Sequence, residues 1–328
     1  MIKRGIGFAC SAQGVNYHFG HADVSNVELQ VQKDNTLLVR TAASDIGQGL
    51  EAALINIASV SFNGFPTDKI IWDGSNTHAP DAGGTGASRQ TTLTGNALVQ
   101  ACNNLKDLLR SVASEQLDCH PDEIEFLGEQ VSANGKSISL SHLFEKARGM
   151  GFSLKAIGSF EAPKTTALSE DGKGYPINQF GYAAHIVELE VDTVTGEVVI
   201  LKVEAFHDAG RILNPINAGG QVEGATVMGM GFALFEDYIL AEGKPINVGF
   251  TNYLIPSVAD MPEIHVHFLA SPAPFGKLGV KGLAEAPTTT IAPAIANAIF
   301  NATGARITHL PATPSRVLAA MVEGQDQV

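Results

Sequence analysis

The sequence has 328 residues, enough for about two domains, and its composition is that of a folded chain. Hydrophobic residues make up 45% and charged residues 17%, whereas disordered chains combine low hydrophobicity with high charge. The formal net charge of −13 argues against a nucleic-acid-binding surface, because contacts to phosphates need a basic patch. No apolar run approaches the roughly 18 residues of a membrane-spanning helix. Neither nucleic acid nor a membrane is therefore an expected partner.

The three cysteines, Cys10, Cys102 and Cys119, form no CxxC pair. This argues against a disulfide framework and against a protein-ligated iron–sulfur cluster. The first residues are too polar, and their apolar run too short, for a secretory signal. We therefore expect the protein in the cytoplasm.

The first half of the sequence alternates between strand-like and helix-like patterns. Residues 27–39 alternate apolar and polar side chains around Asp34-Asn35, which predicts a hairpin. The patterns that follow predict a helix over 50–62, a strand over 69–72, a helix opened by Thr94-Gly95, a hairpin over 124–140 turning at Asn134-Gly135, and a short helix over 143–147.

The second half follows a polar, weakly patterned stretch at residues 163–174. Its patterns predict a hairpin over 187–203 turning at Thr195-Gly196, a helix over 222–235 opened by Gly219-Gly220-Gln221, a strand over 264–269, and a helix capped by Thr290 that ends at Gly304. In both halves a hairpin, a loop and a helix opened by glycine and glutamine follow one another. The repetition predicts an α+β fold of two related subdomains, residues 1–165 and 166–328.

Three glycine-rich loops, at residues 47–49, 83–90 and 219–221, run into predicted helix starts. A helix start binds anions through its free N–H groups and the helix dipole. The amides of Gln48 and Gln221 could also recognise the edge of a heterocycle. A single loop of this kind is most simply a structural one, but three in an acidic protein favour a phosphate-bearing heterocyclic cofactor.

The segment 279–288 places Glu285 among small and apolar residues just before a helix. A carboxylate that is desolvated there would be a stronger base than one in water. Alternatively, Glu285 caps the helix or pairs with Lys281, and the sequence favours neither interpretation. For the neighbours His207 and Asp208 we expect a satisfied surface or core pair rather than a catalytic one.

Several of these segments together resemble the molybdenum hydroxylases, the xanthine oxidase and aldehyde oxidoreductase family. The matching segments are residues 45–49, 86–90 with 94–97, 214–215 with 219–224, 281–285 and the closing 310–314. Their order and spacing carry the resemblance, because no single motif is specific. The resemblance implies the fold of the second half of that family's molybdopterin-binding domain.

The resemblance also assigns roles to individual residues. Molybdenum in this family is held by the dithiolene sulfurs of the pterin, so no protein ligand to the metal is expected. Glu285 corresponds to the catalytic glutamate. The cofactor-binding residues that the resemblance implies are Gly47, Gln48, Gly49, Ala87, Ser88, Arg89, Gln90, Thr91, Gln221, Lys281, Gly282 and Leu283. From their aromatic character alone, Tyr17 and Phe19 are candidates for stacking on a flat substrate.

Within the family, the chain is most similar to the medium molybdopterin subunit of bacterial nicotinate dehydrogenases. This similarity implies hydroxylation of nicotinate to 6-hydroxynicotinate with water as the oxygen source. The implied cofactor is molybdenum bound to molybdopterin cytosine dinucleotide, with a terminal sulfido or selenido ligand. A purine or xanthine hydroxylase, an aldehyde oxidoreductase and a non-catalytic scaffold subunit are the alternatives.

The resemblance covers only the second half of the family's molybdenum subunit. We therefore expect an obligate hetero-oligomer with a large molybdopterin subunit, an FAD subunit and a subunit carrying [2Fe–2S] clusters. Permanent complexes of this kind bury more than about 2,000 Å².

Overall fold

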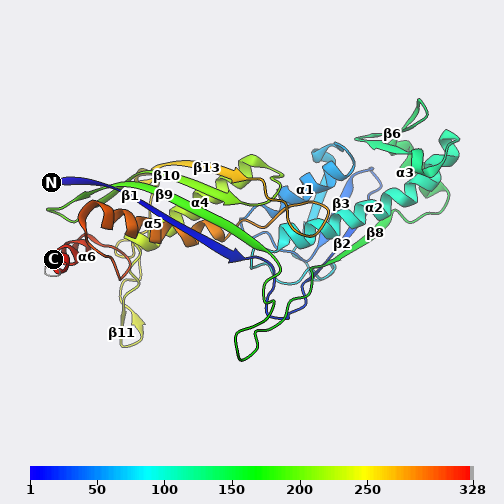
Figure 1. Ribbon diagram of the computed structural model, residues 1–328. Helices are drawn as coiled ribbons and strands as arrows, with labels where there is room; N and C mark the ends of the chain where they lie inside the picture. Colours follow the sequence, from blue (N-terminus) through cyan, green and yellow to red (C-terminus); the bar gives the residue numbers. More distant parts are fainter. Residues whose placement is uncertain (326–328) are drawn as a thin grey trace.

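The computed structural model describes residues 1–325, in which two units, each a sheet with helices, lie end to end in an elongated molecule (Figure 1). This arrangement confirms the predicted α+β fold class. The part of the chain that the structure describes contains no helix with the length and hydropathy needed to cross a membrane.

The first unit is built on a four-stranded sheet of order β4-β3-β2-β8. Its elements are β2 (Val24–Val31), β3 (Leu37–Thr41), α1 (Leu50–Ser61), η1 (Thr67–Lys69), β4 (Ile70–Gly74), α2 (Gln90–Leu117) and β8 (Lys155–Glu161). At its far end η2 (Pro121–Glu123), β5 (Glu125–Leu127), β6 (Gln130–Ala133), β7 (Lys136–Ser139) and α3 (Leu140–Gly149) form a smaller lobe.

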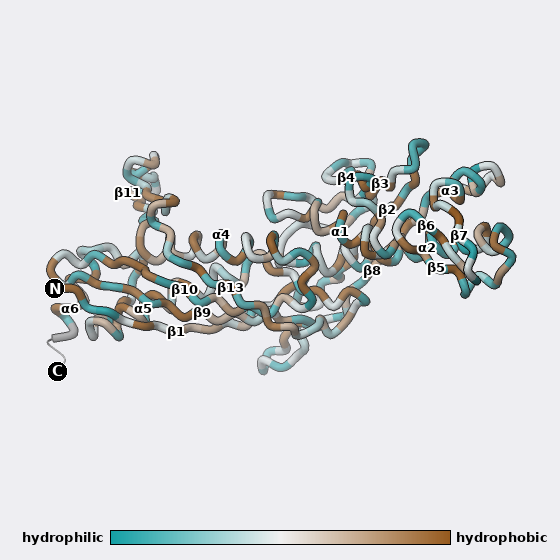
Figure 2. Tube along the Cα trace, turned by 90° about the horizontal axis from the view of Figure 1, so that it is seen from above, coloured by the Kyte–Doolittle hydropathy of each residue, from teal (hydrophilic) through white to brown (hydrophobic). Residues whose placement is uncertain are grey.

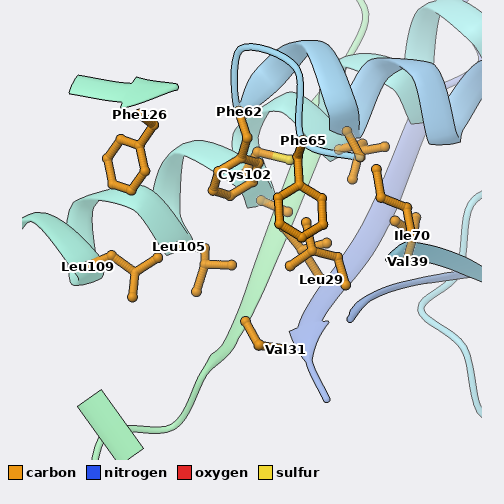
Figure 3. Close-up of a cluster of buried hydrophobic side chains, with 14 of the residues drawn as sticks. Leu29, Val31, Val39, Phe62, Phe65, Ile70, Cys102, Leu105, Leu109 and Phe126 are labelled. Atoms are coloured by element: carbon orange, nitrogen blue, oxygen red, sulfur yellow. The ribbon is translucent and has the colours of Figure 1, made fainter. Parts of the chain in front are cut away.

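The core of the first unit lies between this sheet and its two helices (Figure 3). Leu105 and Leu109 of α2 belong to the same buried cluster as Leu29 and Val39 of the strands, and each such burial contributes roughly 1.5–3 kcal/mol. Cys102 lies in the same cluster, where burial raises the pKa of its thiol to about 12. This cysteine is therefore a packing residue.

The second unit is a four-stranded sheet of order β1-β9-β10-β13. Its elements are β1 (Ile2–Gly14), β9 (Phe180–Asp192), β10 (Val198–Asp208), α4 (Pro215–Leu234), β11 (Leu240–Ala241), β12 (Lys244–Pro245), η3 (Val258–Asp260), β13 (Glu263–Leu269), α5 (Ala286–Thr303) and α6 (Pro314–Gln325). Helices α4 and α5 pack beside each other on this sheet (Figure 1).

Strand β1 belongs to the second unit, although it lies in the predicted first subdomain, residues 1–165. It runs antiparallel to β9 from Ile2↔Asp192 to Gly14↔Phe180. Gly5 and Gly7 explain the position, because a Cβ on either would lie within 2.2 Å of an α5 carbonyl oxygen. The two sheets therefore do not follow the predicted division of the chain at residue 165.

The predicted hairpins are confirmed, but three helix starts are wrong. The turns at Asp34-Asn35, Asn134-Gly135 and Thr195-Gly196 connect β2 to β3, β6 to β7 and β9 to β10. Helix α2 begins four residues before Thr94, α4 begins at Pro215, and α5 begins at Ala286.

Local contacts explain the corrected starts of α4 and α5. Asn214 caps α4 by accepting a hydrogen bond from the N–H of Asn217 at 3.1 Å, and Pro215 occupies the first helical position, which proline favours. Thr290 lies inside α5, where its hydroxyl donates to the carbonyl of Ala286. Gly304 ends α5 as predicted, with a φ of 80°.

Candidate functional site

A cavity of about 250 Å³ lies where the two units meet. Its lining comes from residues 46–53 and 85–91 of the first unit and residues 209–221 and 280–285 of the second. The structure thus brings together the segments that the sequence singled out. The predicted site residues in the lining are Gln48, Gly49, Ser88, Arg89, Gln90, Thr91, Gln221, Lys281, Gly282, Leu283 and Glu285.

Glu285 holds its carboxylate in this cavity through contacts to two other segments. Its Oε2 accepts hydrogen bonds from Ser88 Oγ at 2.9 Å and from Gln13 Nε2 at 3.2 Å. Its Oε1 has no hydrogen-bond partner among residues 1–325. One oxygen is therefore fixed by the protein while the other is left to a ligand.

The two alternative interpretations of Glu285 do not describe its side chain. Glu285 occupies the N-cap position of α5, but its side chain makes no capping hydrogen bond. Lys281 pairs instead with Asp208, with 2.6 Å between Nζ and Oδ2, and both side chains are buried. Asp208 neutralises the lysine, so Lys281 does not pair with Glu285, which lines the cavity.

Gly282 allows the two units to touch beside Glu285. A Cβ at this position would lie 1.5 Å from the carbonyl oxygen of Ser88. Ala87 and Ser88 have φ values of 51° and 48°, in the left-handed region that side chains rarely adopt. The chain bends there so that the Ser88 hydroxyl reaches Glu285.

Arg89 and Gln90 use their side chains to hold their own loop together. The buried guanidinium of Arg89 pairs with Asp23 at 2.6 Å and donates hydrogen bonds to the carbonyls of Val24, Ala82 and Gly84. The Gln90 amide donates to Gly84 and Thr85.

The start of α2 leaves main-chain donors at this loop. No side chain caps α2, and the first N–H groups of any helix lack partners within it. Thr91, in the first turn of α2, lines the cavity. The main-chain N–H groups here remain available to an anion.

The loop before α1 behaves differently, because Asp45 already occupies the helix start. Its carboxylate accepts hydrogen bonds from the N–H groups of Gly47, Gly49 and Glu51 at 2.9, 3.3 and 3.0 Å. Burial of Asp45 raises its pKa, but these main-chain donors outweigh that effect and lower it. An anion at this helix start would therefore meet a carboxylate.

Gln48 and Gly47 are also less available than predicted. The Gln48 amide donates to the carbonyl of Ser44 at 3.0 Å and accepts from the N–H of Ile46 at 2.6 Å. Gly47 and Ala87 do not line the cavity. Gln221 has its place in the second turn of α4 rather than at a helix start, and its amide has no hydrogen-bond partner among residues 1–325.

The two aromatic candidates for the substrate pocket lie outside this cavity. The Tyr17 hydroxyl contacts the main chain of Gly84, and its ring lies 4.7 Å below the guanidinium of Arg89. Phe19 is exposed and packs edge-to-face against His18. Tyr17 supports the loop before α2, and neither ring lines this cavity, so their contact with a substrate stays a prediction.

Arg211 lines the cavity and was missed in the sequence. Its main-chain N–H donates to the carbonyl of Gly279 at 2.8 Å, which fixes it beside the segment that leads to Glu285. The other two cations of the lining, Arg89 and Lys281, are each paired with a buried aspartate. The Arg211 side chain has no such carboxylate among residues 1–325. Arg211 differs from Arg89 and Lys281 because those two side chains form ion pairs, and the sequence does not reveal these pairs.

His207 forms a core pair with His185 rather than with Asp208, and the pair is not satisfied as expected, because each Nδ1 is buried without a hydrogen-bond partner among residues 1–325. The two Nε2 atoms are 3.2 Å apart, and both rings are fully buried. Burial lowers the pKa of His185 to about 3 and that of His207 to about 4. Both rings are neutral near pH 7 and line no part of the cavity.

The lining suits a large anionic ligand with a heterocyclic part. Main-chain N–H groups at α2 and the cation of Arg211 suit phosphate, and the unpartnered amide of Gln221 suits a heterocycle edge. Among residues 1–325 no three His, Cys, Asp or Glu side chains are grouped to hold a metal ion. A metal here would therefore have to arrive with its own ligands.

Known proteins of similar sequence include a subunit of a dehydrogenase complex and a molybdenum-binding subunit. The chain is 31% identical over 298 residues to the gamma subunit of the 6-hydroxypseudooxynicotine dehydrogenase complex of Paenarthrobacter nicotinovorans, covering 89% of this chain and 37% of that protein. It is 30% identical over 326 residues to a putative xanthine dehydrogenase molybdenum-binding subunit of Escherichia coli, covering 96% and 42%. The chain thus spans about two fifths of the length of these relatives.

Solved structures agree. The aldehyde oxidoreductase of Desulfovibrio desulfuricans is 28% identical and superposes with a TM-score of 0.83, covering 98% of this chain and 32% of that one. The Cu,Mo-CO dehydrogenase, at 21% identity and a TM-score of 0.85, shares the fold. The sequence profile of the molybdopterin cofactor-binding domain matches residues 1–262. The chain therefore belongs to the molybdopterin cofactor-binding family of the xanthine dehydrogenases and aldehyde oxidoreductases.

Proposed function

We propose that this chain forms one wall of the active site of a molybdenum hydroxylase that acts on an N-heterocycle. The favoured reaction is the conversion of nicotinate to 6-hydroxynicotinate, with water as the oxygen source. The observation that carries the proposal is the Glu285 carboxylate, which is held in the cavity by Ser88 and Gln13 through one oxygen only.

Glu285 acts as the general base in this proposal. Its Oε1 accepts a proton from the attacking oxygen, while the two hydrogen bonds to Oε2 keep the carboxylate pointed into the cavity. When bound, the molybdenum–pterin group supplies the two-electron redox chemistry. The chain contributes orientation and proton transfer.

The other lining residues hold the cofactor. The N–H groups at the start of α2 and the Arg211 guanidinium bind its phosphates, and the Gln221 amide binds the pterin. We propose the cytosine dinucleotide form, as the family resemblance implies, with the N–H groups at the start of α2 as donors to its phosphates. The terminal ligand on the metal is a sulfido or selenido group.

The partners in this proposal are a large molybdopterin subunit, an FAD subunit and an iron–sulfur subunit. The relative from Paenarthrobacter is named as one subunit of a dehydrogenase complex, which supports a multi-subunit assembly. The relatives are named for a nicotine derivative, for xanthine and for aldehydes, so a panel of these substrates decides the specificity. Turnover of xanthine or aldehydes without nicotinate would contradict the favoured reaction.

The decisive variant is Glu285→Gln in the assembled complex. The amide keeps the shape of the side chain but cannot accept the proton, so kcat should fall by roughly 10²–10⁴. Molybdenum and pterin content, measured by elemental analysis and fluorescence, should equal those of the wild type. A wild-type assembly without molybdenum would support a scaffold subunit, and near-normal turnover of the variant would remove Glu285 from catalysis.

A further inference from the structure

Helix α4 carries an apolar ridge that its sheet does not cover. The ridge consists of Ile216, Gly220, Gly224, Met228 and Phe232, which follow one another every fourth residue. The three large side chains are exposed, Ile216 to 86% and Met228 to 63%. Neighbouring members of such a row contact one another, and the row winds around the helix by about 40° at each step of four residues.

The glycines of the ridge have no packing role within the described residues. A Cβ on Gly220 or Gly224 would meet no atom within 4 Å. Glycine in the middle of a helix is destabilising relative to alanine, so a reason for it must lie outside these contacts. Close approach of another backbone is such a reason.

An apolar arm, residues 236–261, follows directly after this helix. It stands away from the body of the molecule around β11 (Figure 1), and the perpendicular view in Figure 2 shows hydrophobic stretches along it. Ten large apolar side chains of the arm are exposed: Tyr238, Ile239, Leu240, Ile246, Val248, Phe250, Leu254, Ile255, Val258 and Met261. Val258, at 91%, and Val248, at 81%, are almost fully exposed.

The arm is ordered by polar contacts, whereas its apolar side chains point outward. Asn247 is buried, and its side chain accepts a hydrogen bond from the N–H of Ile239 at 3.0 Å. The Tyr253 hydroxyl donates to Glu236 at 2.7 Å, and Arg316 pairs with Asp237 at 3.0 Å. Apolar patches of this extent are rare on stable monomers and mark a protein interface.

The ridge also begins at the edge of the cavity. Asn217, Ala218 and Gln221 line the cavity, and Ile216 and Gly220 lie beside them on the same helix. A polypeptide that covers the ridge therefore also reaches the cavity and can complete its wall.

We propose that the ridge and the arm together bind the polypeptide that supplies the rest of the molybdopterin site. That polypeptide corresponds to the part of the relatives outside the match, since this chain covers only 32–42% of their length. Its contact surface is apolar, and its backbone approaches Gly220 and Gly224. A second copy of this chain is disfavoured because two copies would bring together net charges of −13 each. This inference rests on the proposed function for the identity of the partner.

The test uses a photo-crosslinking amino acid placed in the tagged chain, with the assembly purified from its native host. Positions Met228 and Phe250 probe the ridge and the arm. Val194, 73% exposed at the β9–β10 turn, is the control. Mass spectrometry should map crosslinks from Met228 and Phe250, but not from Val194, to a polypeptide that matches the uncovered part of the relatives. Crosslinks to a second copy of this chain, or none, would overturn the proposal.

A pair of glycine variants tests the close approach. Gly224→Leu should reduce the assembled fraction in native mass spectrometry at least tenfold, whereas Gly149→Leu should not. Gly149 lies at the end of α3 and also has open space around it. Neither isolated variant should melt below the wild type, and full assembly of Gly224→Leu would reject the proposed contact. If the expected crosslinks form but the assembly contains no molybdenum, the proposed interface is supported and the proposed function is rejected.

Discussion

Two loops that contain glycines, residues 44–49 and 83–90, run into helix starts at the same cavity, but their chemistry differs. In the first, the Asp45 carboxylate accepts hydrogen bonds from main-chain N–H groups at the start of α1, and the Gln48 amide donates a hydrogen bond to Ser44 of the same loop. In the second, no side chain caps α2, and Ser88 reaches across to Glu285. The first loop is closed by its own side chains and the second is open to a ligand.

The difference shows that glycine content and a helix start do not by themselves make an anion site. What decides is whether an acceptor of the same chain already occupies the helix start. In the second loop, the buried carboxylate of Asp23 neutralises Arg89. The donors that remain for a ligand at the start of α2 are main-chain N–H groups. Substitutions in the two loops should therefore differ in their effects on stability, catalysis and cofactor binding.

The largest expected effect is on stability at the second loop. Arg89→Met leaves Asp23 buried without its partner, which typically lowers the free energy of unfolding by about 3–5 kcal/mol. Thermal and urea denaturation measure the change. The double variant with Asp23→Asn should recover much of the loss. If Arg89→Met instead kept its stability and only lost cofactor, Arg89 would be a ligand rather than a brace.

The next effect is on catalysis. Ser88→Ala removes one of the two hydrogen bonds that position Glu285, and a bond to a charged group of this strength corresponds to about a tenfold fall in kcat. Molybdenum content should not change. Since Ser88 acts through Glu285, the pH profile of kcat should shift as well, and an unchanged profile would reduce Ser88 to a structural role.

At the first loop, Asp45→Ala should lower the free energy of unfolding by about 1 kcal/mol, because it removes a helix cap. The folded state lowers the pKa of Asp45, so its contribution is full above the unfolded value of about 4 and is lost as the pH falls through the folded value. Urea denaturation should therefore show the wild type and the variant converging below about pH 4. Cofactor loss from Asp45→Ala without a change in stability would contradict the contrast between the loops.

The smallest effect is expected at Gln221. Gln221→Ala should weaken cofactor retention by about 1 kcal/mol, roughly fivefold, without altering the melting temperature. Gln100→Ala, which removes an exposed amide of α2, provides the control. Equal cofactor content in both variants would exclude a pterin contact from Gln221.

The parts of the fold that local chemistry determines could be predicted. Asn134 and Gly135 have φ values of 52° and 76°, which a tight hairpin turn requires, and such residues mark turns in the sequence. The start of α4 was misplaced because Gly219 and Gly220 outweighed the capping pair Asn214-Pro215. A Cβ on either glycine would meet no atom within 4 Å, so both lie on the exposed surface of α4 and do not mark its start.

The candidate site could be predicted by segment but not by side chain. The four segments around the cavity were identified, and Glu285 lies in it. The partners of Arg89, Lys281 and Glu285 come from residues 66, 73 and 197 positions away along the chain. No local pattern encodes such contacts, so the sequence could not show which cation is neutralised and which, like Arg211, is not.

The position of β1 has a consequence for how the chain acquires its structure. The amino group of Met1 contacts Asp192, 191 residues later, and the whole strand depends on β9 for its hydrogen bonds. A ribosome releases the N-terminal strand first, yet that strand has no sheet to join until β9 and α5 have been synthesised. Contacts between such distant residues slow folding, because the loop between them must be closed before they gain anything. The first unit can mature during synthesis, whereas β1 stays without its partner strand until β9 has been made, and it is the segment for which a chaperone would matter most.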